Sequence, residues 1–197
     1  GFVADPSPVL DLLELLKDDP ALYVRRSVAN NLNDIAKDHP DVVVDVCRRW
    51  HKDATAERAW LVAHALRTLV KRGHPGALDV LGFGAAATVS TSDLRIEPAS
   101  PRIGDRVRIA VTVTNDAANP CALLADLRVH FVKANGATSP KVFKLTTLTL
   151  EPGESAALAK HIALNQQTTR THYPGHHAVE LLVNGTPLPL GSFTLVN

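Results

Sequence analysis

The sequence predicts a multidomain α + β protein, in which a helical region precedes an antiparallel β-sandwich. Up to about Gly82, apolar residues recur every three to four positions, which is typical of amphipathic helices. From residue 93 onward they alternate with polar residues, as in half-buried strands. Between the two lies FGAAATVSTS, a run of small residues. We therefore place helical repeats at 1–82, a linker at 83–92 and a sandwich at 93–197.

The helical region contains four apolar stripes. Each stripe fits one amphipathic helix, and prolines lie near several of the starts, where a helix tolerates them. Short connections between the stripes predict two antiparallel helix pairs. The stripes begin at Leu10, Val24, Val42 and Leu61.

The second and fourth stripes also resemble each other. Tyr23 and Trp60 occupy matching places, 37 residues apart. This spacing is close to that of HEAT-like helix-pair repeats, so we expect an α-α solenoid. About three repeats are usually needed for stability. Because only two are visible, and the chain lacks methionine and starts within the pattern, we expect it to be the C-terminal part of a longer protein.

The second region contains seven strand candidates separated by turn signals. The clearest candidate is RVRIAVTVTN at 106–115, and EPGE at 151–154 and Asn184-Gly185 are typical turns. Seven short strands in about a hundred residues predict an immunoglobulin-like sandwich. The remaining candidates are DLRIEP, DLRVHF, KVFKLTTLTL, SAALAKHIAL, HAVELLVNG and SFTLV.

Composition narrows the class of protein. Of the 197 residues, 45% are hydrophobic and 21% charged, which is typical of a soluble globular protein. The formal net charge is +1, so any nucleic-acid contact requires a local basic patch. Two cysteines in different domains form no disulfide framework, and no apolar run approaches the roughly 20 residues that span a bilayer. We expect a cytoplasmic bacterial protein and a monomer.

The helix from Tyr23 to Asp38 carries an unusual polar flank. If Val28 lies at the centre of the buried face, the 100° step per residue places Ser27, Asn31 and Asp34 on one flank. A carboxylate near a helix C-terminus opposes the helix dipole, and such a local conflict is typical of functional sites. Arg25 is predicted on the other flank near the core, and the solvent side is predicted to carry Arg26, Asn30, Asn33 and Lys37.

The fourth helix is expected to face the same groove. In HEAT-type solenoids the second helix of each pair lines the concave surface. The matching charges on that helix are Arg58, Arg67, Lys71 and Arg72. Charged helix faces are more often only solvated, and an asparagine such as Asn31 often serves as a spacer, so both interpretations stay open.

Metal and cofactor chemistry find little support. The histidines of THYPGHH at 171–177 form a cluster, but neighbouring residues of a strand point to opposite faces. No phosphate-binding loop, GxSxG or HExxH motif occurs. We expect no metal and no cofactor.

Several stretches resemble a known family. YVRRSVANNLNDIAKDHPD and RAWLVAHALRTLVKRGHPGAL resemble the HEAT-repeat alkylpurine DNA glycosylases, in particular the AlkC branch of the AlkC and AlkD group. VFKLTTLTLEPGES and TTRTHYPGHHAVELLVNG resemble the immunoglobulin-like domain that some AlkC proteins append. The resemblance implies hydrolysis of the N-glycosidic bond of cationic alkylpurines, chiefly 3-methyladenine, in double-stranded DNA without base flipping.

The resemblance also implies residue roles. Asp34 matches a catalytic carboxylate, and further carboxylates and aromatic residues are expected upstream of Gly1. Ala63 departs from the pattern, because a basic residue is expected there. The residues implied in DNA binding are Arg25, Arg26, Asn31, Arg67, Lys71 and, in the second domain, Arg170.

Two alternatives remain. A non-enzymatic HEAT-repeat scaffold with a protein- or DNA-binding sandwich predicts apolar anchors on exposed helix faces. Tyr23 and Trp60 are the candidates for such anchors, although we expect both to pack between repeats. A paralogue that binds DNA without catalysing cleavage is the other alternative.

Overall fold

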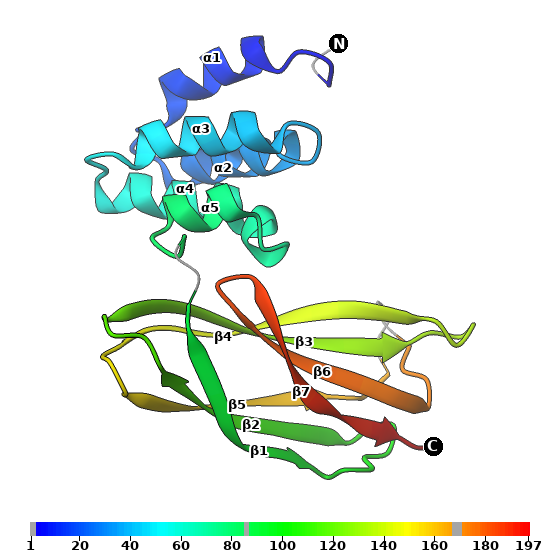
Figure 1. Cartoon of the computed structure of the whole chain (residues 1–197). Helices are drawn as coiled ribbons and strands as arrows, with labels where there is room; N and C mark the ends of the chain where they lie inside the picture. The colour runs from blue at the N-terminus through cyan, green and yellow to red at the C-terminus, as the bar shows by residue number, and fades with distance from the viewer. Residues whose placement is uncertain (1–2, 85–86, 167–170) are drawn as a thin grey trace. The chain divides into compact units, whose positions relative to one another are not determined.

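The computed structural model describes residues 3–84, 87–166 and 171–197, and the chain divides into two compact units, Gly1–Ala85 and Ala86–Asn197 (Figure 1). The first unit is helical and the second consists of strands. This order confirms the predicted fold class. Each unit has its own apolar core.

Within the described part of the helical unit, five helices are present. Figure 1 shows α3 and α5 in front of α2 and α4, and α2 packs against α4, so the second helix of each pair lies in one layer, as a HEAT-like repeat requires. Prolines open α1, α3 and α5, where a missing N–H does no harm. The bounds are Ser7–Leu16 for α1, Leu22–Ile35 for α2, Pro40–His51 for α3, Ala56–Lys71 for α4 and Pro75–Val80 for α5.

Helix α5 was not predicted. The sequence predicts four helices, but a His-Pro pair opens a fifth helix, α5, at 74–75, just as one opens α3 at 39–40. Its six residues are too few to show a helical period. They nevertheless bury Ala77, Leu78 and Val80.

The described residues of the sandwich form two antiparallel sheets. One has the strand order β1-β2-β5 and the other β4-β3-β6-β7. Alternation along β2 is as predicted, since Val107, Ile109, Val111 and Val113 are buried and face the core. The bounds are Val89–Glu97 (β1), Arg106–Asn115 (β2), Cys121–Val132 (β3), Thr138–Leu150 (β4), Ser155–Ala163 (β5), Gly175–Val183 (β6) and Thr186–Leu195 (β7).

Strand β1 begins earlier than predicted. The sequence predicts a linker at 83–92, yet Val89 to Ser92 pair with Asn115 to Thr112 of β2. Backbone hydrogen bonds form this pairing, and the side chains of an edge strand can stay exposed, so no apolar signal marks it. The Asn184-Gly185 turn between β6 and β7 is as predicted, with both residues at positive φ, 47° and 78°. Among the described helices, none is long and apolar enough to cross a membrane.

Candidate nucleic-acid interface

Helices α2 and α4 lie side by side and in register. Nη2 of Arg67 donates to Oδ1 of Asn30 at 3.0 Å, and the two residues are 37 positions apart. This offset equals the predicted repeat period. Because α2 and α4 run in the same direction, Ser27 therefore lies level with His64, and Asp34 level with Lys71. We call the outward surface formed by Arg26, Asn30, Asp34, His64, Arg67 and Lys71 the α2–α4 face.

Asp34 is exposed on this face, with 67% of its side chain accessible. Its Oδ1 lies 2.7 Å from Nζ of Lys37, which is itself 57% exposed. Such a surface pair is weak and easily exchanged for another partner. The Asp34 carboxylate is therefore open to an incoming ligand.

Ser27 and Asn31 bind their own helix. The Ser27 hydroxyl donates to the carbonyl of Tyr23, and Nδ2 of Asn31 donates to the carbonyl of Ser27, both at 3.1 Å. These bonds to the preceding turn are typical of small polar residues within helices. The three residues of the predicted flank thus share a side of α2, while Asn31 and Ser27 form their bonds away from Asp34.

The prediction for Asn33 was wrong. It was placed on the solvent side, but only 6% of the residue is exposed. Helix α2 packs against both α1 and α4, so its buried face is wider than a stripe centred on Val28 and extends through Ala29 to Asn33. Among the described residues, Oδ1 of Asn33 has no hydrogen-bond partner.

The cations of the helical unit fall into two groups. Within the described part of the chain, Arg26, Arg67, Lys71 and Arg72 form no ion pair with a carboxylate, whereas Lys17, Lys37, Arg48 and Arg58 each do. Arg58 was predicted to face the groove with the first group. Instead its Nε and Nη2 donate to Asp18 at 2.7 and 2.5 Å, and this ion pair lowers the pKa of the Asp18 carboxyl.

Arg25 has a local structural contact. Its Nη1 donates to the carbonyls of Asp19 and Pro20, at 2.7 and 2.8 Å. These carbonyls belong to the turn between α1 and α2, so the guanidinium stabilises that turn. A contact between Arg25 and DNA stays a prediction.

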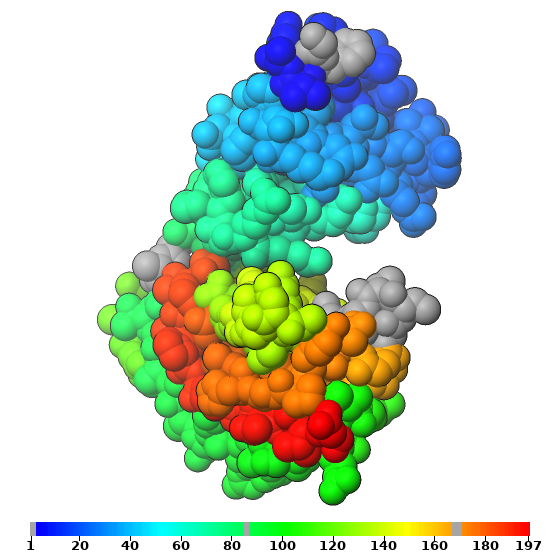
Figure 2. All heavy atoms as spheres, turned by 90° about the vertical axis from the view of Figure 1, so that its right-hand side faces the viewer, coloured from blue at the N-terminus to red at the C-terminus, as the bar shows by residue number. Residues whose placement is uncertain are grey.

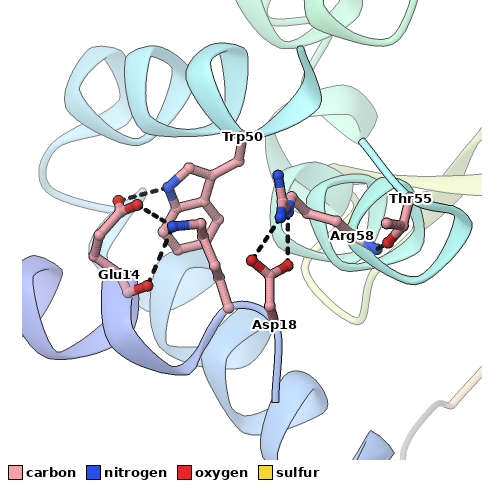
Figure 3. Close-up of polar contacts among 6 residues, drawn as sticks. Glu14, Asp18, Trp50, Thr55 and Arg58 are labelled. Atoms are coloured by element: carbon pink, nitrogen blue, oxygen red, sulfur yellow. Dashed lines mark hydrogen bonds and ion pairs between the residues drawn. The ribbon is translucent and has the colours of Figure 1, made fainter. Parts of the chain in front are cut away.

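A second polar cluster ties α1 to α3 and α4 (Figure 3). Nε1 of Trp50 donates to Oε2 of Glu14 at 2.7 Å, and Lys17 pairs with the same carboxylate. The pKa of Glu14 is lowered, first by the hydrogen bond from Lys17 and then by that from Trp50. We call Glu14, Lys17, Asp18, Trp50 and Arg58 the junction. Each of its charges has a partner within the protein.

Sequence reasoning missed an aromatic pair on α4. The rings of Trp60 and His64 stack with centroids 5.1 Å apart and an interplanar angle of 8°. Trp60 is 38% exposed and Tyr23 80% exposed, so the expectation that both pack between repeats was wrong. Burial, and then the charges of Arg67 and Arg26, lower the pKa of His64. The sequence did offer one signal of this stacking, because His64 lies one helical turn after Trp60.

The sandwich contributes less to the candidate interface. Arg170 lies outside the described residues. His176 is exposed and His177 is buried, so the neighbours point to opposite faces, as expected. Searched over the described residues, the structure contains no group of three or more His, Cys, Asp or Glu that could hold a metal ion.

The fold and the α2–α4 face define a protein that joins HEAT-like helices, with unpaired cations on one face, to an immunoglobulin-like sandwich. Residues 90–197 match the family model described as "Uncharacterised protein YhaZ, C-terminal Ig-like domain". The chain belongs to this family.

Two relatives extend the likeness to the helical unit. The uncharacterized protein YhaZ of Bacillus subtilis (strain 168) is 36% identical over 182 residues, which cover 92% of this chain and 50% of the relative. The structure of Pseudomonas fluorescens alkylpurine DNA glycosylase AlkC bound to DNA containing an abasic site analog matches with a TM-score of 0.96 and 39% identity. That match covers 100% of this chain and 54% of AlkC. The predicted relation to AlkC is confirmed, and the chain spans about half the length of these relatives.

Proposed function

We propose that this chain is the C-terminal part of a DNA alkylation repair glycosylase. The longer protein hydrolyses the N-glycosidic bond of cationic alkylpurines, chiefly 3-methyladenine, in double-stranded DNA without flipping the base. The observation that carries the proposal is the α2–α4 face, where an accessible Asp34 carboxylate lies among cations that lack carboxylate partners. The likeness to an AlkC solved with DNA, over the whole chain, supports it.

The chemistry requires little from the protein. When the bond between C1′ and the purine nitrogen breaks, its electron pair goes to the purine and neutralises the positive charge of the alkylated ring. The sugar is left with an oxocarbenium-like charge, which a nearby carboxylate stabilises. A water oxygen then bonds to C1′ and gives up a proton. The negatively charged Asp34 carboxylate can stabilise the sugar cation, and it can also accept a hydrogen bond from the attacking water.

The cations of the face are suited to hold the duplex. Among the described residues, no carboxylate forms an ion pair with Arg26, Arg67 or Lys71. A phosphate can therefore bind these side chains without breaking an existing ion pair. Asn30 holds the Arg67 guanidinium in place before DNA arrives. Backbone contacts of this kind position a protein without reading sequence. Arg25, Asn31 and Arg170 remain further candidates from the resemblance.

The test is an Asp34→Asn variant of the full-length protein, assayed for release of 3-methyladenine from methylated duplex DNA. We expect a fall of about 10²-fold or more, as when one electrostatic group of a transition state is removed. Affinity for undamaged duplex should stay within about twofold, because Asn keeps the shape of the side chain. The matched control is Asp38→Asn, an exposed carboxylate four residues away. Wild-type release by Asp34→Asn, or an equal loss in the control, would refute the assignment.

A second candidate function has one observation in its favour. The exposed Tyr23 and Trp60 are the apolar anchors that a non-enzymatic scaffold requires. Binding to duplex DNA separates the two candidates. A scaffold that binds protein through Tyr23 and Trp60 predicts no release of alkylpurine by the full-length protein and no salt-dependent affinity for duplex DNA.

A further inference from the structure

Asp34 and Lys37 form an ion pair that joins no two parts of the helical unit. Nζ of Lys37 lies 2.7 Å from Oδ1 of Asp34, and both side chains are more than half exposed. Every other ion pair in the described helical unit either links separate segments or includes a side chain that also contacts a second helix. The pair between Asp34 and Lys37 therefore contributes little to the fold.

Lys37 lies on the α2–α4 face, in the turn that follows α2. Ala36 keeps helical φ and ψ of −62° and −11°, so the turn continues the helix and places Lys37 on the same side as Asn30, seven residues earlier. Figure 2 looks onto the end of the unit at which α2 and α4 finish, in light blue and blue-green. Asp34 and Asp38 flank Lys37 in sequence, and in the described structure its ammonium pairs with Asp34 and not with Asp38.

An acidic and a basic residue three positions apart also occur on ordinary helices, where they stabilise the helix slightly. Asp45 and Arg48 on α3 are such a pair, with the same spacing. Arg48 also reaches Asp79 of α5, and α3 lies in the other layer of the unit (Figure 1). The pair on α2 differs because its carboxylate lies on the face whose other cations have no carboxylate partner among the described residues.

The charge of Asp34 has opposite consequences before and during the reaction. A bare carboxylate repels the phosphates of an approaching duplex, because like charges are brought close together. In the free protein the ammonium of Lys37 offsets this repulsion. During the reaction the same ammonium would repel the positive charge that develops on the sugar, so the carboxylate stabilises that charge best when it is unpaired.

A lysine is suited to meet both requirements. Its ammonium is a compact charge with three donors on a flexible four-carbon stem, so it can turn from one acceptor to another. An exposed ion pair is weak enough to be exchanged. The duplex supplies the second acceptor, a phosphodiester oxygen close to the carboxylate. The exchange moves one ammonium group and breaks no covalent bond.

We propose that Lys37 is a positioning residue that changes partner when the duplex binds. Its ammonium pairs with Asp34 in the free protein and with a phosphodiester oxygen in the complex. The Asp34 carboxylate is then unpaired where the sugar cation forms. The role of Asp34 in the reaction rests on the proposed function, whereas the exchange of partners is a property of binding and can be measured on undamaged DNA.

The first test is the salt dependence of binding of the full-length protein to an undamaged duplex. Lys37→Gln should lower the slope of log affinity against log salt by about 0.9, and should weaken binding by up to about eightfold at about 0.1 M salt, since one phosphate contact is lost. Lys37→Arg should keep the wild-type slope. The matched control is Arg48→Gln, which removes one charge from a pair of the same spacing and should also keep it. Thermal unfolding verifies that each variant is folded.

The exchange also predicts the sign of a coupling. In Asp34→Asn, Lys37 has no carboxylate to leave when DNA binds. Lys37→Gln should therefore weaken duplex binding more in the Asp34→Asn protein than in the wild type. A lysine that stayed on Asp34 in the complex would give the opposite result, because its only effect on binding would be to neutralise that carboxylate.

Release of 3-methyladenine provides a third measurement. In Lys37→Gln, KM for methylated duplex should rise by the same factor as the dissociation constant. The value of kcat should stay within about twofold of the wild type, since Lys37 no longer contacts Asp34 in the complex. Lys37→Arg should restore KM.

Three results would overturn the proposal. They are an unchanged salt slope in Lys37→Gln, a smaller loss of affinity in the Asp34→Asn protein than in the wild type, and a fall in kcat with an unchanged KM. The last would show that Lys37 acts on Asp34 within the complex. If Asp34→Asn released 3-methyladenine at the wild-type rate, the proposed function would fail, while the two affinity measurements would still decide whether Lys37 changes partner.

Discussion

The junction and the α2–α4 face are two polar regions of one small helical unit, and they use charge differently. At the junction, Glu14 and Asp18 each have a cation or an indole N–H as partner (Figure 3). On the face, Arg26, Arg67 and Lys71 have no carboxylate partner among the described residues. Paired charges join helices, and unpaired charges remain available to an anionic ligand. The difference predicts which substitutions change stability and which change binding.

The largest effect should come from Trp50, the centre of the junction. It is 2% exposed and packs in the core of the helical unit. Trp50→Ala should lower the free energy of unfolding by about 3–5 kcal/mol, because it leaves a cavity and removes the indole N–H that donates to Glu14. Urea unfolding measures this. Trp60→Ala, which removes the exposed ring stacked on His64 of the face, is the control. Equal losses of stability in the two variants would remove the distinction between the regions.

Arg58 should show a smaller effect of the same kind. Arg58→Gln breaks the two hydrogen bonds to Asp18 and should lower the free energy of unfolding by about 1 kcal/mol at low salt. High salt should shrink the difference, since the pair is partly exposed. Arg67→Gln, on the face, should change stability by less than about 0.5 kcal/mol. If Arg67→Gln lowered the free energy of unfolding more than Arg58→Gln does, the α2–α4 face would itself stabilise the fold, contrary to this prediction.

In the sandwich, the buried side chain of His177 makes stability depend on pH. His177 is fully buried, its Nδ1 accepts from the N–H of Val132 at 3.4 Å, and its Nε2 donates to the carbonyl of Tyr173 at 3.3 Å. Burial lowers the pKa of His177. The unfolded chain therefore binds a proton near its ordinary pKa of about 6.5, where the folded chain does not. Stability is complete above that pH and falls as pH decreases below it.

Urea unfolding at pH 7.5 and 5.5 measures this dependence. His177→Gln should be less stable at pH 7.5 but should lose less on acidification than the wild type. His161→Gln, at an exposed position, should retain the wild-type dependence. An identical loss on acidification in His177→Gln would show that another group titrates.

Much of the fold follows from local pattern. The 37-residue repeat predicted that α2 and α4 match, and the Arg67 to Asn30 hydrogen bond joins matching positions. Period two predicted the buried residues of β2. These signals are strong because one face of each element is buried and the other is not.

Other features depend on what each element packs against. Asn33 is buried because α2 contacts more than one neighbour, and a single-stripe interpretation gives too narrow a face. Arg58 pairs with Asp18, 40 residues away, and sequence carries no signal of that contact. The exposure of Trp60 depends likewise on its neighbours, since a large aromatic residue at a helix start is compatible with packing or with solvent.

The most direct test of the account is the salt dependence of duplex DNA binding by this chain. Two variants remove the same charge: Arg26→Gln with Arg67→Gln on the face, and Arg48→Gln with Arg58→Gln, whose guanidinium groups are paired with Asp45 and Asp18. The account predicts that the slope of log affinity against log salt falls by up to about two in the first variant and stays at the wild-type value in the second. Equal slopes in the two variants would contradict it.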